Sequence, residues 1–245
     1  MILRTAHADK VTPEVTGLTT PISIWDVPEQ GTRGPKGKYD RSAITAAAVR
    51  LADAGGLEAA TMRAVAAELG MAPMSLYNYV PAKDHLIQLM TDRVGAEYRY
   101  QELPAAPRDA MVALARQGRD IARRHPWLPD AMRRPAVIGP NGLAYIDCFL
   151  GLLAGSALDM TAKMELISMV NGFSVSYGGL EQPGAGVSLE QYLAAQVATL
   201  VSAAATGNYP NLATALSQSA PSQQRDADEI FDSAVGRLID GALAG

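Results

Sequence analysis

The chain has 245 residues, of which 48% are hydrophobic and 19% charged, and its net charge is −4. That length allows two modest domains or one large helical one, and a single cysteine, Cys148, excludes an internal disulfide and a cysteine-based metal cluster. No secretory signal is evident, and the longest apolar stretch, residues 143–158, is shorter than the roughly 20 residues of a membrane span, so we expect a soluble, cytoplasmic protein.

Positive charge is concentrated in one part of the chain. Residues 31–93 carry eight Lys and Arg against six Asp and Glu, a surplus of +2, whereas residues 1–30 have a charge of −2 and residues 94–245 of −4. The net acidity therefore does not exclude a nucleic-acid partner for the middle segment. A surplus this small predicts modest non-specific affinity, so tight binding would need two such segments on one duplex.

Residues 1–39 form an extension with little regular pattern. Glycines alternate with Arg33, Lys36 and Lys38, and a cationic, glycine-rich segment can follow a DNA minor groove. The alternative is a solvated flexible linker. Farther upstream, an apolar group that includes Ile24 and Trp25 is expected to dock on a neighbouring helix, either of its own subunit or of another.

Three short helices are predicted between residues 42 and 80. The first covers Ser42–Ala54 and ends at two glycines. Thr61 is suited to cap the second, and Gly70 follows that helix, where a residue without a Cβ is favoured. Pro73 is tolerated in the first turn of the third helix because its missing N–H would be unpaired there.

The second and third of these helices form a helix-turn-helix pattern, the arrangement that places a helix in the DNA major groove. Val65, Leu76 and Val80 are expected to point inward. Four polar or aromatic residues of the third helix are left to face outward: Ser75, Tyr77, Asn78 and Tyr79. An ordinary hairpin of a helical bundle would show a similar pattern. Beyond Pro81, a connecting helix is predicted from Lys83, which could meet a phosphate, to Tyr100.

The C-terminal half reads as helices separated by loops that contain glycine and proline. The expected helices are 107–125, 143–156, 162–177, 188–205 and 226–242, with a break at residues 126–129. Because no convincing strand is found, the predicted fold class is all-α.

A ligand pocket in this half would be lined by methionines and aromatic residues around one amide. The candidates are Trp127, Met132, Phe149, Met160, Met164, Met169, Asn171, Phe173 and Tyr177. Residues of these types, taken singly, belong more often to the ordinary core than to a ligand site. The three histidines, His7, His85 and His125, suggest no metal site, and no cofactor is predicted.

The segment from Ser42 to Leu89 resembles the DNA-binding domain of the TetR family of transcriptional repressors. The resemblance is carried by AITAAAVRLADAGGLEAATMRAVAAELG, by MSLYNYV and by the KDHL segment at residues 83–86. HPWL at 125–128, GPN at 139–141, Gly172-Phe173 and YPNLATAL at 209–216 resemble the tetracycline-repressor type of C-terminal domain. The likeness covers residues from about 40 to the end.

This resemblance implies a homodimeric repressor of a palindromic operator in double-stranded DNA, released by a small, apolar or aromatic effector. It implies an extension at residues 1–39, a three-helix head at 40–92 and a larger ligand-binding and dimerisation domain at 93–245, with helices 162–177 and 226–242 at the dimer seam. Carried over by position, the residues at the DNA surface would be Thr61, Arg63, Pro73, Met74, Ser75, Tyr77, Asn78, Tyr79 and Lys83.

The sequence supports other classes of function to different degrees. No catalytic motif such as G-x-S-x-G, H-E-x-x-H or a P-loop is present, so an enzyme is not expected. A transcriptional activator of the same family, or a helical small-molecule-binding protein without DNA affinity, would have the same sequence features.

Overall fold

The computed structural model describes residues 23–28, 39–181, 189–218 and 226–244, and every regular element in these ranges is helical. The predicted all-α class is therefore confirmed. In the described parts of the chain, no helix is both long and apolar enough to cross a bilayer. Arg33, Lys36 and Lys38, the cations of the predicted arm, lie outside the described residues.

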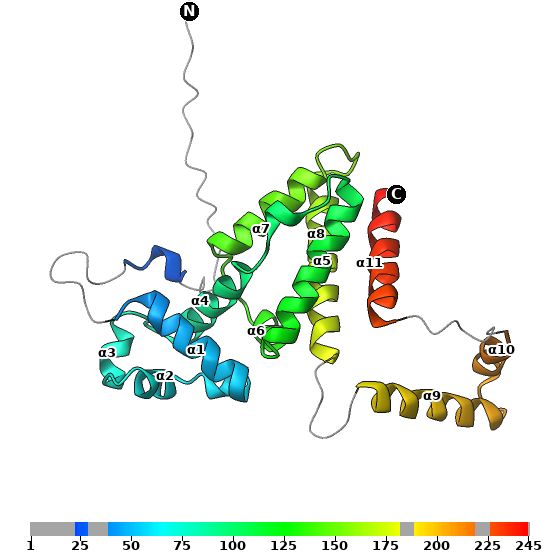
Figure 1. The fold of residues 1–245 in the computed structure, drawn as a ribbon, viewed down its shortest axis with the longest axis horizontal. Helices are drawn as coiled ribbons and strands as arrows, with labels where there is room; N and C mark the ends of the chain where they lie inside the picture. Colours follow the sequence, from blue (N-terminus) through cyan, green and yellow to red (C-terminus); the bar gives the residue numbers. More distant parts are fainter. Residues whose placement is uncertain (1–22, 29–38, 182–188, 219–225, 245) are drawn as a thin grey trace, which may run out of the picture.

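The head consists of three helices, the first of which packs against the connecting helix (Figure 1). They are α1 (Arg41–Gly55), α2 (Met62–Glu68) and α3 (Pro73–Tyr77), and the connecting helix is α4 (Lys83–Gly95). A short 3-10 helix, η2 (Leu57–Ala59), joins α1 to α2. α4 is shorter than expected because the turn at residues 95–98 and η3 (Tyr100–Glu102) redirect the chain before α5.

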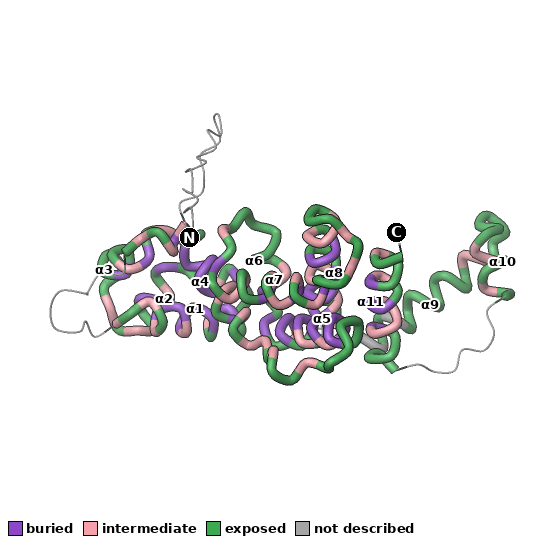
Figure 2. Tube along the Cα trace, turned by 90° about the horizontal axis from the view of Figure 1, so that it is seen from above, coloured by how far each residue is buried: buried purple, intermediate pink, exposed green. Residues whose placement is uncertain are grey.

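The body is built around α5 (Pro107–Arg124) and α8 (Met160–Leu180), which lie side by side. α7 (Pro140–Leu152) and α11 (Ala227–Ala244) pack against this pair in both views (Figures 1 and 2). Where a break was predicted at residues 126–129, the chain forms the short helix α6 (Leu128–Met132), with Pro129 in its first turn.

Two helices stand apart from the body, α9 (Leu189–Ala205) and α10 (Pro210–Gln218), and their described residues are largely exposed (Figure 2). The sequence predicted α9 but missed α10. Residues 210–218 form only two and a half turns after a glycine with positive φ, Gly207, too short a stretch for a periodic pattern to emerge.

Two hydrophobic clusters form the core. One contains the head residues Ile44, Val65 and Leu76 and continues into Trp127 and Val175 of the body. The other lies within the body, and includes Leu114, Phe149, Leu166, Phe231 and Ile239. Because the first cluster crosses the boundary between head and body, the placement of the head is coupled to the packing of α5, α6 and α8.

Candidate nucleic-acid interface and internal cavity

The helix-turn-helix has the local geometry that its sequence predicts. The Thr61 hydroxyl accepts a hydrogen bond from the Ala64 N–H at 3.0 Å and caps α2. Gly70 closes that helix with φ of 64°, and the Met71 N–H donates to the Ala66 carbonyl at 2.9 Å. This is the Schellman arrangement, which satisfies carbonyls at a helix end and turns the chain sharply.

Buried apolar residues fix the orientation of α3. Leu76 and Val80 are fully buried, as are Val65 and Ala66 of α2. With one face held in this way, the opposite face of α3 must point away from the head. That face is available for a partner.

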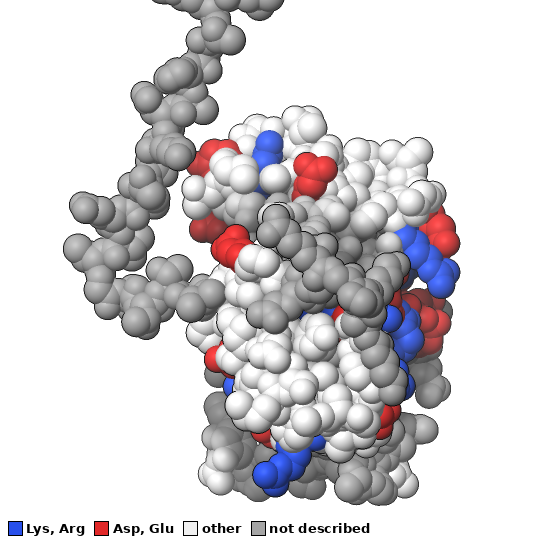
Figure 3. Space-filling view, turned by 90° about the vertical axis from the view of Figure 1, so that its left-hand side faces the viewer, with Lys and Arg blue, Asp and Glu red and all other residues white. Residues whose placement is uncertain are grey.

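Most of the predicted DNA-facing residues lie on this exposed side. Met74 is 76% exposed and Tyr77 43% exposed. Five further candidates of the set are also exposed: Thr61, Arg63, Pro73, Ser75 and Asn78. Seen from the end that carries the head, the surface is largely uncharged, with acidic and basic residues scattered around its edges (Figure 3).

Two residues of the set are placed differently from the expectation. Tyr79 is half-buried against the head core, and its carbonyl accepts a hydrogen bond from Arg41 Nε at 2.9 Å. Lys83 is also half-buried, and its Nζ lies 2.8 Å from Glu58 Oε2. The hydrogen bond and charge of Lys83 hold the pKa of Glu58 below its usual value.

A cavity of about 350 Å³ lies where α4, α6, α7 and α8 converge. Its size falls in the range of small-molecule sites, and its wall is mainly apolar. Two tyrosines belong to this wall, the partly buried Tyr98 and the buried Tyr145, and their ring centroids are 4.8 Å apart. Burial raises the pKa of both phenols, so they remain neutral.

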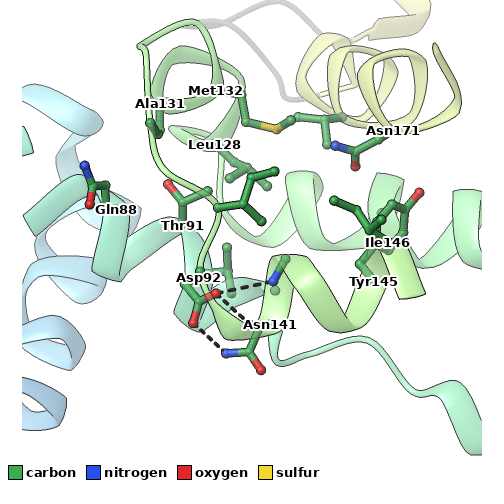
Figure 4. Close-up of a pocket in the computed structure, with 18 of the residues that line it drawn as sticks. Gln88, Thr91, Asp92, Leu128, Ala131, Met132, Asn141, Tyr145, Ile146 and Asn171 are labelled. Carbon is green, nitrogen blue, oxygen red and sulfur yellow. Dashed lines mark hydrogen bonds between the residues drawn. The ribbon is translucent and has the colours of Figure 1, made fainter. Parts of the chain in front are cut away.

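The polar groups of the cavity come from several helices (Figure 4). Asp92 of α4 accepts hydrogen bonds from the Asn141 N–H and from Asn141 Nδ2, both at 2.8 Å. A third, from the Gly142 N–H, spans 3.3 Å. Because these donors lie in the first turn of α7, the carboxylate caps that helix and links α4 to it.

Three of the nine pocket candidates, Met132, Met164 and Asn171, lie on this cavity wall. Figure 4 shows Met132 and Asn171 on facing sides. The others do not line it. Met160 and Met169 are exposed on α8, at 59% and 47%.

The remaining four candidates are aromatic residues of the core. Phe149 is fully buried in the body cluster, and Phe173 and Tyr177 pack on Phe231 with centroids 5.6 and 5.2 Å apart. Trp127 is 1% exposed and its Nε1–H donates to Asp53 Oδ1 at 2.7 Å. Residue type favoured these positions, but the four side chains pack in the hydrophobic core or against it.

Sequence reasoning missed most of the wall, including Gln88, Thr91, Asp92, Tyr98 and Tyr145. A polar residue such as Asp92, in the third turn of a helix with buried apolar neighbours, was the available signal. Among the described residues, no group of His, Cys, Asp and Glu is arranged to hold a metal ion.

A polar joint connects head and body beside the cavity. His125, at the end of α5, has its two ring nitrogens 2.7 Å from Asp53 Oδ1 and 2.8 Å from Glu97 Oε1. Partial burial by itself raises the pKa of Glu97, but hydrogen bonds and charge from Arg124 and His125 outweigh it and lower that pKa. The joint thus ties α1 to the C-terminal end of α5 and to the turn that follows α4.

Comparison with known proteins adds independent findings. The family model described as "Bacterial regulatory proteins, tetR family" matches residues 44–90, and the one described as "Tetracyclin repressor-like, C-terminal domain" matches residues 103–244. The HTH-type transcriptional repressor DrrR1 of Streptomyces coeruleorubidus is 36% identical over 202 residues, which are 78% of this chain and 74% of the relative.

Solved structures give the same picture. Apo ActR from Streptomyces coelicolor has a TM-score of 0.70 and 26% identity, covering 86% of this chain and 98% of that one. The complex of ActR with actinorhodin has a TM-score of 0.69 and 26% identity, covering 85% and 99% of the two chains.

Proposed function

The chain belongs to the TetR family of transcriptional regulators, and from that premise we propose a homodimeric repressor that binds a palindromic operator and leaves it when a small molecule enters the cavity. The observation that carries this proposal is the course of α4. That helix begins at Lys83 beside the head and reaches the cavity wall at Gln88, Thr91 and Asp92. The same helix therefore contacts both the DNA-binding head and the cavity.

The proposed DNA contacts come from the exposed side of the helix-turn-helix. They are Thr61, Arg63, Pro73, Met74, Ser75, Tyr77, Asn78 and Lys83, together with Arg33, Lys36 and Lys38 of the extension. Tyr79 is better suited to hold α3 than to read bases, since its side chain is half-buried and its carbonyl is bonded to Arg41. The proposed domains are residues 1–39, 40–92 and 93–245.

Dimerisation is supported by apolar side chains that stand exposed on the described helices. Leu180 of α8 is 72% exposed, and Ile230 of α11 is 45% exposed. A Cβ on Gly172 would meet no atom within 4 Å, so a second helix could approach α8 there. Gly236, in contrast, faces Arg108 of its own chain and would not contribute to a seam. Two heads spaced by about 34–36 Å would read successive major grooves.

The effector class follows from the cavity. Its wall pairs apolar and aromatic surface with a few amide and hydroxyl groups, from Gln88, Thr91 and Asn171, which suits an aromatic molecule bearing carbonyls or hydroxyls. ActR, which resembles this chain, was solved with actinorhodin. An effector acts only if it prefers the head arrangement that cannot bind DNA, and couplings of about 1–3 kcal/mol would weaken operator binding roughly 5–150-fold.

Selection of bound duplexes from a random pool tests the proposal. We expect enrichment of an inverted repeat whose half-sites are one or more helical turns apart, and weaker binding of the selected duplex when actinorhodin is added. Enrichment of a single half-site would contradict the dimeric reading, and no enrichment at all would contradict DNA recognition. Size-exclusion chromatography with light scattering measures the oligomeric state separately.

A further inference from the structure

The short segment at residues 23–28 lies outside both regions matched by the family models, yet it is attached to the molecule at two places. It contains one turn of 3-10 helix, η1 (Ile24–Asp26), capped by Ser23, whose Oγ accepts from the Trp25 N–H at 3.2 Å. Ile24 is fully buried in the core cluster of the head. The segment therefore docks on helices of its own chain.

The first attachment is to the outer side of the cavity wall. The Ile24 N–H donates to Gln88 Oε1 at 3.2 Å, and Gln88 is itself buried and lines the cavity. The Trp25 ring lies against Gly139, where a Cβ would collide with Trp25 Cζ2 and with the Asp92 carboxylate. Three cavity-lining residues, Gln88, Asp92 and Gly139, are thus in reach of two consecutive residues of the segment.

The second attachment is to the head, through Arg41 at the start of α1. Its Nη1 donates to the Val27 carbonyl at 2.8 Å and to the Ile24 carbonyl at 3.3 Å, and its Nη2 donates to the Pro28 carbonyl at 3.3 Å. The Nε of the same guanidinium donates to the Tyr79 carbonyl, two residues beyond α3. One planar group therefore holds the segment and the end of α3 together.

These contacts form a continuous path from the cavity to the recognition helix. A molecule that displaces Gln88 or the loop at Gly139 must also displace Ile24 or Trp25. The interior is close-packed, so a residue cannot move without moving the residues in contact with it. A shift of residues 24–28 must in turn move Arg41 or break its bonds to their carbonyls. This path leaves α4 at Gln88 and continues through Trp25 and Arg41, which lie outside that helix.

We propose that residues 23–28 are a strap that transmits the state of the cavity to α3, with Trp25 as its contact at the cavity and Arg41 as the residue that positions α3. The proposal rests on the proposed function, since it presupposes DNA binding by α3. By reciprocity, operator binding must then alter the cavity wall through the strap, so the coupling can be measured with DNA alone.

The test is amide hydrogen exchange of the full-length protein, with and without the selected operator duplex. In the wild type we expect the operator to slow exchange at Asn141 and Gly142, next to the strap contact. Trp25→Ala should reduce that slowing about fivefold or more, while the operator still protects the head amides of residues 62–80. Trp25→Phe keeps an aromatic ring but loses the second ring of the indole and an Nε1–H that has no hydrogen-bond partner among the described residues, so it should retain part of the slowing that Trp25→Ala loses.

Arg41→Lys provides an independent variant, because lysine retains the charge but cannot bond to four carbonyls in one plane. We expect it to weaken operator binding about fivefold and to remove the protection at residues 141–142. If Trp25→Ala or Arg41→Lys is folded by circular dichroism and still shows undiminished protection at residues 141–142, the proposed role of the strap is wrong. The proposed role is also wrong if, in the wild type, the operator protects the head amides but does not slow exchange at residues 141–142. A wild type that binds no selected duplex would instead overturn the proposed function.

Discussion

The Lys83 ammonium lies 2.8 Å from a carboxylate oxygen of Glu58, and Arg134 lies 3.2 Å from the other oxygen of the same carboxylate. Glu58 belongs to the head, whereas Arg134 belongs to the cavity wall. The lysine expected to meet a phosphate is therefore already engaged by an acidic residue. A phosphate would have to compete with this pair.

Glu58→Gln should strengthen operator binding, because it frees Lys83 and removes a negative charge beside the DNA. Exposed ion pairs are weak, so we expect a gain of about twofold to fivefold in affinity, measured by fluorescence anisotropy at fixed salt. Glu102→Gln, which removes an exposed carboxylate outside the head, is the matched control. Lys83→Ala should reduce the magnitude of the slope of log K against log salt by about 0.9 for each bound head, and an unchanged slope would exclude Lys83 from the phosphate contacts.

Tyr77→Ala should weaken operator binding while leaving the head folded, since its side chain is 43% exposed and α3 is held by Leu76 and Val80. The loss of one specific base or phosphate contact predicts a cost of about 1–3 kcal/mol, equivalent to roughly 5–150-fold. Electrophoretic mobility shift with the selected duplex measures it. If Tyr77→Ala also lowers the melting temperature markedly, the residue serves packing and its assignment to the DNA surface is wrong.

Asp92→Ala should destabilise the contact between α4 and α7, because three donors of the α7 N-terminus lose their acceptor. Loss of such a cap predicts a decrease of about 1–2 kcal/mol in the free energy of unfolding, measured by urea denaturation. Asp92→Asn retains one acceptor oxygen and should recover part of this loss. Equal losses for both variants would mean that the carboxylate acts through its charge instead of its geometry.

Among the charged residues of the body, Arg119 should be the one whose substitution lowers the free energy of unfolding most. It is 2% exposed, is paired with the buried Glu181 and with Asp228, and lies 4.8 Å from the Phe231 ring centroid. The hydrogen bonds and charges of these carboxylates raise its pKa. Arg119→Ala leaves the buried Glu181 with Arg123, at 2.7 Å, as its remaining partner among the described residues, so we expect a loss of about 3 kcal/mol, the lower end of the range for a broken buried pair, in urea denaturation at fixed protein concentration. Adding Glu181→Gln to that variant should recover part of the loss, and no recovery would contradict the charge argument.

The joint at His125 predicts a pH dependence through Glu97. Because the pKa of Glu97 is lowered from its usual value of 4.5, its contribution to stability is complete above that value and is lost as the pH falls through the lower, folded-state pKa. Glu97→Gln should therefore flatten the acid side of a stability curve below about pH 4.5, while Glu102→Gln should not. Parallel acid limbs for the wild type and Glu97→Gln would show that the joint does not contribute.

The local features of the helix-turn-helix were predictable because they depend on residues close together in the chain. The Thr61 cap, the closing turn at Gly70 and the buried positions of Val65, Leu76 and Val80 all follow from helical periodicity and from the conformational freedom of glycine. The same rules located α5, α8 and α11 within a few residues. They concern neighbours within one or two turns, which a sequence contains in full.

Contacts between distant segments were decided only by tertiary structure. Methionine or aromatic character predicted cavity positions for Phe149 and Trp127, but both side chains are buried in the core. Conversely, Asp92 and Asn141 meet at the cavity across 49 residues, and Lys83 meets Glu58 across 25. The hydrophobic effect favours burial of an apolar side chain but does not specify which residues it packs against, because it is non-directional. The packing of whole helices determines which side chains surround a cavity and which fill the space between helices.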